Sequence, residues 1–265
     1  MPKITPSYVK DDLLASLKIC GGYYKTKRDT AGNAMSPLVG FAATYMGLII
    51  EDGNFSGKKI RMQHPKVLHF VGDEYFNFAM LEQYGWILNH FAYLLMDQVV
   101  VQDPDVFVGA PMGGIMLCAA MARNVGIRGI FAEKKQVPPE INSKALYEDP
   151  IFYDGFESLE IDRHEIIPGD RVVIVDDVCH NFSTAKKLIP KIEALGGEVV
   201  GIACAINRAL DTAKAIDRPV YSLIHIPTAH YRQDDPLVAE DVARGNVVWT
   251  PKGKVEWARL QEFMK

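Results

Sequence analysis

The sequence has none of the features that mark a membrane-bound, exported or disulfide-stapled protein. No stretch approaches the roughly eighteen consecutive apolar residues that a membrane span needs, and the opening residues, MPKITPSYVKDDLL, lack the apolar core of a signal peptide. The sequence has no CxxC pair and no HxxxH motif, and its four cysteines are Cys20, Cys118, Cys179 and Cys204. We therefore expect a cytoplasmic protein with reduced thiols and no transition-metal site.

The sequence also lacks an excess of basic residues, an internal repeat and a flexible linker. Its 33 acidic and 29 basic residues give a formal net charge of −4 at pH 7, which argues against non-specific binding to nucleic acid or to an anionic membrane. No Gly/Ser-rich tract divides the 265 residues, so the chain is expected to form one large α/β domain with extensions.

What the sequence does contain is an alternation of short apolar strands and helical segments, which predicts βαβ units around a parallel sheet. The expected strands are 105–109, 128–132, 171–175, 198–206 and 220–224, and the expected helices are 113–124, 184–195 and 208–216. Outside this core we expect a hairpin over 48–62, a long amphipathic helix over 73–98, and tail helices over 236–244 and 254–263. Trp249 and Trp257 are expected to pack on the body of the protein.

Two polar segments allow more than one interpretation. Residues 23–37 carry Lys25, Lys27 and Arg28, and form either a substrate-facing loop or a solvated connection. Residues 133–167 are far longer than the usual connection in such a sheet, and carry eight acids between Gln136 and Glu165 against one lysine and one arginine. They form either a lid or a solvated insertion.

The most informative stretch is GDRVVIVDDVCHNFSTAKK, residues 169–187. Its short Val/Ile run predicts a strand buried on both faces, hence central and parallel. Asp176 and Asp177 follow at the carboxyl end of this strand, where open α/β sheets bind ligands. Ser183 or Thr184 can cap the next helix, whose amino terminus suits an anion. This pattern favours a ligand that carries both hydroxyls and a phosphate, although a strand with an acidic end and a capped helix is the plain structural alternative.

The stretch resembles the phosphoribosyl pyrophosphate (PRPP) signature of the type I phosphoribosyltransferases, in which an apolar strand, two acids and a small Thr/Gly-rich loop follow one another. The loop departs from the pattern, because His180, Asn181 and Phe182 stand where the family usually has Thr, a small residue and Gly. A Phe keeps its backbone N–H and can donate to a phosphate if its backbone angles are ordinary. We expect an altered cradle that persists, with the Phe182 ring turned onto neighbouring apolar surface.

Three further segments resemble parts of the same family. The turn Ala110, Pro111, Met112, Gly113 and Gly114 is similar to its pyrophosphate loop, although tight packing alone also explains such a turn. Lys134 matches the lysine of an Arg-Lys pair at the base of the family's mobile hood, with Glu133 in place of the arginine and Lys135 adjacent. Within this family the chain resembles the orotate phosphoribosyltransferases most closely, and Arg208 matches the arginine that helps hold the orotate carboxylate there. The structural alternative is that Arg208 pairs with Asp211.

The resemblance implies a Rossmann-like phosphoribosyltransferase sheet flanked by helices, with a hood insertion and terminal extensions. It divides the chain into a hood-like N-terminal appendage of the same domain (1–100), a core (101–228) and a tail packed on the core (229–265). The implied activity is transfer of the 5-phosphoribosyl group from PRPP to a nucleobase, in particular orotate in pyrimidine biosynthesis, by a Mg²⁺-dependent homodimer. A different base, or a non-catalytic PRPP-binding regulator on the same fold, stays open.

The resemblance also implies a role for each matching residue. Lys134, Asp176 and Asp177 would be catalytic, and the two acids would bind the ribose hydroxyls directly or through the waters of the metal. The ribose 5′-phosphate would be bound by His180, Asn181, Phe182, Ser183 and Thr184. Residues 110–114, with Lys134 and Lys135, would bind the pyrophosphate, and Arg208 would bind the base.

Overall fold

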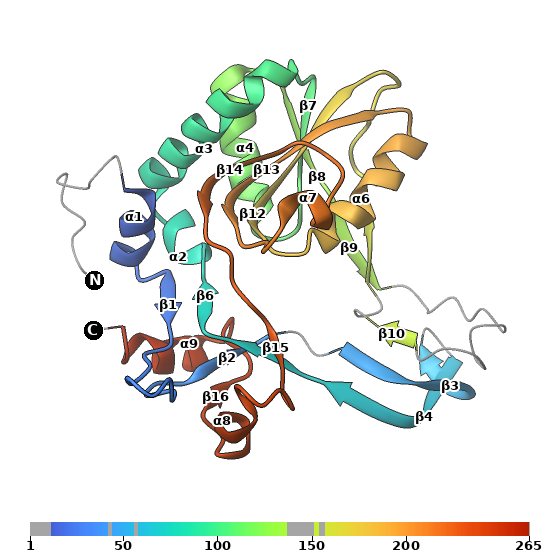
Figure 1. Cartoon of the computed structure of the whole chain (residues 1–265). Coiled ribbons are helices and arrows are strands. Elements are labelled where there is room, and N and C mark those ends of the chain that lie inside the picture. Colours follow the sequence, from blue (N-terminus) through green and yellow to red (C-terminus); the bar gives the residue numbers. More distant parts are fainter. Residues whose placement is uncertain (1–11, 42–43, 56–57, 137–150, 154–156, 265) are drawn as a thin grey trace.

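The computed structural model describes residues 12–41, 44–55, 58–136, 151–153 and 157–264, and its centre is a five-stranded parallel sheet (Figure 1). The strands lie in the order β14-β13-β12-β7-β8, and each pairs in parallel with its neighbours. They are β7 (Val106–Gly109), β8 (Arg128–Phe131), β12 (Arg171–Cys179), β13 (Glu198–Asn207) and β14 (Val220–His225). The predicted central parallel sheet is confirmed.

Helices cover both faces of this sheet, and the side chains of β12 alternate between them. Val173 and Val175 belong to a core that includes α3 (Gly85–Val99) and α4 (Gly114–Val125). Val172 and Ile174 belong to a second core under α6 (Ser183–Ala194). Figure 1 shows α3 and α4 on one side of the sheet and α6 on the other. Burial on both faces explains the unbroken apolar run of β12, because a strand alternates its side chains with a period of two.

A second, smaller sheet joins segments from the two ends of the chain. Its order is β15-β5-β2-β16, and β2 and β16 pair in parallel with Val247 opposite Leu38. Its strands are β2 (Leu38–Gly40), β5 (Phe70–Gly72), β15 (Tyr231–Arg232) and β16 (Val247–Val248). The C-terminal helix α9 (Lys254–Gln261) packs beside this sheet, since its Trp257 and Leu260 are buried in one cluster with Tyr24 and Tyr75. The tail is thus part of a core, together with residues from the first eighty.

The predicted helix over 73–98 is wrong in its first half. Residues Glu74–Phe76 form strand β6, which pairs antiparallel with β1 (Tyr23–Lys25). A four-residue helix, α2 (Ala79–Glu82), follows, and α3 begins only at Gly85. An apolar stripe at helical spacing does not show where a helix begins, and here the pairing with β1 decides the conformation.

Other element boundaries also differ from those expected. The hairpin is longer than predicted, with β3 (Thr44–Phe55) and β4 (Lys58–Leu68) extending away from the parallel sheet (Figure 1). In the 133–167 insertion, β9 (Glu133–Gln136) pairs with β11 (Glu157–Glu160), and β10 (Ile151–Tyr153) pairs with β3; residues 137–150 lie outside the described chain. Two helices are shorter than expected, α7 (Thr212–Ala215) and α8 (Ala239–Ala243), and the first described helix is α1 (Leu13–Ile19).

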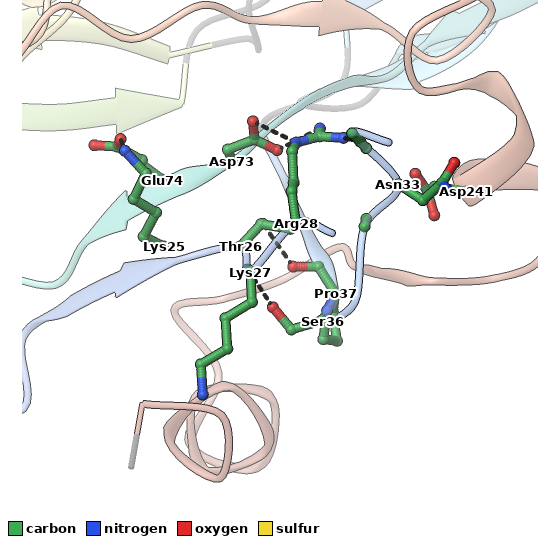
Figure 2. Close-up of polar contacts among 12 residues, drawn as sticks. Lys25, Thr26, Lys27, Arg28, Asn33, Ser36, Pro37, Asp73, Glu74 and Asp241 are labelled. Carbon is green, nitrogen blue, oxygen red and sulfur yellow. Dashed lines mark hydrogen bonds and ion pairs between the residues drawn. The ribbon is translucent and has the colours of Figure 1, made fainter. Parts of the chain in front are cut away.

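The polar segment 23–37 is tied down by contacts within the N-terminal region (Figure 2). The Arg28 guanidinium donates to both carboxylate oxygens of Asp73, at 3.1 and 2.7 Å. Lys25 Nζ pairs with Glu74 Oε1 at 2.7 Å, and Thr26 Oγ1 donates to the Pro37 carbonyl at 2.9 Å. These pairings favour the interpretation of the segment as a structural connection. No helix in the described part of the chain is both long and apolar enough to cross a membrane.

The packing of α9 generates a stability prediction. Trp257→Ala should lower the free energy of unfolding by about 3–5 kcal/mol, because it leaves a cavity beside Tyr24 and Tyr75. Urea unfolding followed by circular dichroism measures this change. Trp257→Phe is the matched control: it keeps a ring and removes an indole N–H that is buried without a partner, so it should cost less than half as much. Equal stability of Trp257→Ala and the wild type would mean that the tail does not support the fold.

Candidate active site

The carboxyl end of β12 lies against the turn that follows β7. A Cβ added at Gly113 would overlap the Asp177 carboxylate, and one added at Gly114 would overlap the carbonyl oxygen of Val175. Only a residue without a side chain permits so close an approach. Gly113 therefore leaves room for the Asp177 carboxylate beside the predicted pyrophosphate turn, and Gly114 leaves room for the backbone of β12.

The two acids share one partly enclosed corner. The Asp177 N–H donates to Asp176 Oδ1 at 3.0 Å. Burial raises the pKa of Asp176 well above its ordinary value, and the neighbouring Asp177 carboxylate raises it further. A corner in which two carboxylates repel each other favours a ligand that brings hydroxyl donors or a cation.

The loop between β12 and α6 leaves backbone N–H groups at the start of the helix unbonded by any described residue. Phe182 has φ +58° and ψ +26°, the left-handed conformation, so the expectation of ordinary backbone angles is wrong: Phe182 takes up a conformation that glycine adopts most easily. Its ring is 2% exposed and packs under α6 with Ala185 and Ile189, as predicted. The Asn181 side chain accepts from the Ser183 N–H at 3.1 Å. No acceptor within the described residues takes the N–H groups of Phe182 or Thr184.

The turn at 110–114 divides into a structural start and an accessible middle. Ala110 is fully buried and its N–H donates to the Val175 carbonyl at 2.8 Å, so this group is not available to a ligand. The Gly114 N–H likewise donates to the Ala110 carbonyl, at 3.0 Å. The intervening peptide Pro111–Met112 is cis. Pro111, Met112 and Gly113 line a cavity, and they are the part of the predicted turn that a ligand can reach.

Two adjoining cavities meet at the acids. One, of about 500 Å³, is polar and lies between the 111–113 turn and the start of α6. The other, of about 860 Å³, has several aromatic side chains in its walls and is called the aromatic cavity below. Both are lined by Asp176, Val178, Ser183, Thr184 and Lys252. A ligand that occupies both would place its middle at Asp176.

Three lysines line the polar cavity, and the sequence predicts only Lys134 among them. Lys134 lies on β9 as predicted, whereas Lys135 forms an ion pair with Asp162 and is not part of the cavity wall. Lys187 comes from α6, one helical turn after Thr184. Lys252 comes from the turn before α9, where no local pattern marks it as a ligand-binding residue.

Arg208 lies at the aromatic cavity in a buried and closely bonded position. It is 5% exposed, and its Nε donates to Thr228 Oγ1 at 2.9 Å, while its Nη2 donates to the Glu74 carbonyl at 3.1 Å. The guanidinium also lies 5.1 Å from the ring centroid of Phe41. Burial lowers the pKa of Arg208 to about 10, so it keeps its charge at neutral pH. The alternative pairing with Asp211 is wrong, because Asp211 caps α7 and pairs with Lys214.

The remaining walls of the aromatic cavity come from distant parts of the chain. His230 stacks on Phe41 with ring centroids 3.7 Å apart, and on His180 at 3.8 Å. Phe70, Tyr75 and Trp249 complete the aromatic lining. Trp249 is therefore a cavity residue rather than only a packing residue, contrary to the expectation from the sequence.

The family of the protein follows from comparison with known sequences. The Phosphoribosyl transferase domain matches residues 81–239, well over half of the chain. This chain belongs to the phosphoribosyltransferase family. It has the type I fold of that family. Its activity is the family's transfer of phosphoribosyl groups, with PRPP and a nucleobase as substrates. Several cavity residues lie outside the matched region, namely Phe41, Phe70, Tyr75, Trp249 and Lys252.

Individual relatives differ in the base that their names specify. An orotate phosphoribosyltransferase of Caldanaerobacter subterraneus subsp. tengcongensis is 28% identical over 171 residues, which are 64% of this chain and 80% of the relative. An adenine phosphoribosyltransferase of Thermotoga petrophila is 37% identical over 106 residues, 40% of this chain and 61% of the relative. The solved Leishmania donovani UMP synthase superposes with a TM-score of 0.48 and 16% identity, covering 97% of this chain and 42% of that one.

The conformation of Phe182 can be tested by replacing this residue with alanine and, separately, with glycine. Both Phe182→Ala and Phe182→Gly lose the buried ring and should be less stable than wild type by about 2–5 kcal/mol. Because φ is positive, the Gly variant should be the more stable of the two by about 1 kcal/mol. Chemical denaturation measures both. The reverse order, which is usual in helices and strands, would contradict a left-handed Phe182.

The acidic corner generates a prediction about pH. The pKa of Asp176 is raised in the folded state, so ionising it is less favourable there than in the unfolded chain, where the pKa is about 3.9. Stability is therefore lost as pH rises from about 4 through the folded pKa. Asp176→Asn removes this loss, and the ligand-free variant should melt at a higher temperature than wild type at pH 7 to 8 but not at pH 3.5. A lower melting temperature at pH 7 would contradict the repulsion.

Proposed function

We propose that this phosphoribosyltransferase transfers the 5-phosphoribosyl group of PRPP to orotate and releases pyrophosphate. The observation that carries the proposal is a buried, charged arginine, Arg208, in the wall of an aromatic cavity that adjoins a lysine-lined cavity at Asp176. Orotate combines a flat ring with a carboxylate, and PRPP carries its phosphates on both sides of a ribose. The sizes and linings of the two cavities suit this pair of substrates.

PRPP would lie across the shared floor of the cavities. Asp176 and Asp177 would accept from the ribose hydroxyls. The free N–H groups at the start of α6, with Ser183 and Thr184, would hold the 5′-phosphate, since a helix amino terminus favours an anion. The 111–113 turn with Lys134 and Lys187 would hold the pyrophosphate.

In this arrangement catalysis is positioning together with charge stabilisation. The bond from C1′ to the pyrophosphate oxygen breaks as negative charge grows on the leaving group, and Lys134, Lys187 and Lys252 lie where they can meet that charge. Positive charge grows on the ribose ring next to the Asp176 and Asp177 carboxylates. A ring nitrogen of the base, held in the aromatic cavity, then forms the new bond to C1′, and its proton is released to water or to the departing pyrophosphate.

The residues of the site fit Mg²⁺, the metal that the family resemblance implies. The available donors are carboxylate oxygens, which Mg²⁺ prefers. The pKa of Asp176 is raised by burial and by the Asp177 carboxylate, and a cation would relieve the repulsion between the two acids. Asp176 and Asp177 would hold the ion through its waters, and the bound ion would neutralise pyrophosphate charge. A cytoplasmic homodimer completes the proposal and rests on the family resemblance alone.

Orotate is preferred to adenine because of the charge of Arg208. None of the ion pairs of the described residues includes this buried guanidinium, which donates to a hydroxyl, a carbonyl and an imidazole. The nearby Glu74 carboxylate acts on Arg208 through its charge, but it is paired with Lys25. A carboxylate on the base would supply a counter-charge bonded directly to Arg208. Adenine stays the second candidate, because adenine-specific relatives share 37% identity over part of the core.

Pyrophosphate release tests the proposal. With PRPP, Mg²⁺ and a panel of orotate, uracil, adenine and hypoxanthine, we expect release with orotate. Asp177→Asn should lower kcat/KM by about tenfold to a hundredfold, through the loss of a charged hydrogen bond worth about 1.5–3 kcal/mol. Lys252→Ala should lower it by about tenfold, whereas its exposed neighbour Lys254, which lines neither cavity, supplies the silent control Lys254→Ala. Release with adenine alone would overturn orotate as the substrate, and no release with any base would overturn the enzymatic proposal.

A further inference from the structure

His230 is held more tightly than a residue of a cavity wall needs to be. Both faces of its imidazole are covered, by Phe41 and by His180, with interplanar angles of 22° and 25°. Its Cδ2 edge approaches Gly72, since a Cβ added there would lie 3.5 Å from that atom. Only the edge with Nδ1 and Nε2 is left for polar contacts.

The contact with Arg208 fixes which ring nitrogen carries the proton. Arg208 Nη2 lies 3.1 Å from His230 Nε2. A guanidinium donates and never accepts, so Nε2 must be the acceptor and must be unprotonated. A neutral imidazole with an unprotonated Nε2 carries its proton on Nδ1. Burial, with the nearby His180 and Arg208, lowers the pKa of His230 to about 2, which keeps the ring neutral at working pH.

The protonated Nδ1 belongs to a ring that lines the aromatic cavity. Among the described residues, no hydrogen bond uses this atom, and the one polar contact of the ring is that of Nε2 with Arg208. The wall beside Arg208 thus offers a fixed N–H donor whose direction the ring stack determines.

We propose that His230 is a specificity-determining residue, which donates from Nδ1 to an acceptor on the edge of the base. This inference rests on the proposed function and narrows it to a substrate class: bases that present neighbouring acceptors, such as a carboxylate beside a ring carbonyl. A base with an amino group at this edge would face two donors, Arg208 and His230, and would leave them unpaired. Unpaired buried donors are costly, so the pair rejects amino bases more strongly than it attracts oxo bases.

Two substitutions separate the two nitrogens of the ring. The amide nitrogen of His230→Asn can take the place of Nδ1, which keeps the donor to the base and loses the acceptor for Arg208. The side-chain oxygen of His230→Gln can take the place of Nε2, which keeps the partner of Arg208 and loses the donor to the base. We expect His230→Gln to raise the KM for orotate tenfold or more and His230→Asn to change it less than threefold, with the KM for PRPP within twofold of wild type in both.

A second readout does not depend on turnover. Long-range ¹⁵N–¹H NMR of the full-length wild-type protein at pH 7 should show His230 with a protonated Nδ1 and an unprotonated Nε2, the resonance being assigned by its loss in His230→Gln. A protonated Nε2 would overturn the inference. So would equal effects of the two variants on the KM for orotate, or efficient use of adenine.

The experiment also distinguishes this inference from the proposed function. If the wild type releases no pyrophosphate with any base, the proposed function fails, and calorimetric titration with orotate of the wild type and both variants still decides the role of His230. In that case tenfold weaker binding to His230→Gln alone supports the inference, and binding that is equal in all three overturns it. If turnover is normal but insensitive to both variants, only the inference fails.

Discussion

The structure depends on the contact between the end of β12 and the turn after β7. There the Ala110 N–H bonds to the Val175 carbonyl, and Gly113 and Gly114 leave room for Asp177 and for the backbone of β12. This contact brings two adjacent acids, an accessible turn and the start of α6 to one edge of the sheet. Each cavity has its floor at this edge, so any side chain placed at position 113 or 114 would disturb both the fold and the site.

The walls above this floor come partly from outside the region that the family shares. Phe41, Phe70 and Tyr75 precede it and Trp249 and Lys252 follow it, and the small sheet in which β2 pairs with β16 brings the two groups together. The polar cavity is therefore built mainly from the region that the family shares, whereas the aromatic cavity combines that region with additions to it. If the proposed function holds, such a division would let base preference change while the chemistry at Asp176 and Asp177 stays the same.

Features of the fold and the site that one short stretch of sequence encodes could be predicted, and features that depend on pairing between distant segments could not. The apolar run of β12, the two acids and the start of α6 occur together in one stretch of sequence, and the structure has all three. The strand continues through the acids to Cys179, however, and the N-cap of α6 is Phe182 rather than Ser183 or Thr184. Lys252 and Phe41 carry no local signal, because a parallel pairing between segments two hundred residues apart brings them to the cavity. Lys134 and Lys135 are neighbours in sequence and were expected at the same site. Successive side chains of a strand point to opposite faces, so in β9 only Lys134 lines the polar cavity, while Lys135 pairs with Asp162. The 73–98 helix failed because pairing with β1 outweighs helical periodicity at Glu74–Phe76.

The most direct test of the central claim is a crystal structure of the protein with orotidine 5′-monophosphate. The phosphate should lie within hydrogen-bonding distance of the backbone N–H groups at 182–184, the ribose hydroxyls should contact Asp176 or Asp177, and the pyrimidine should lie in the aromatic cavity with its carboxylate at Arg208. A nucleotide bound elsewhere, or a phosphate excluded from the start of α6, would contradict the assignment of this site to phosphoribosyl transfer.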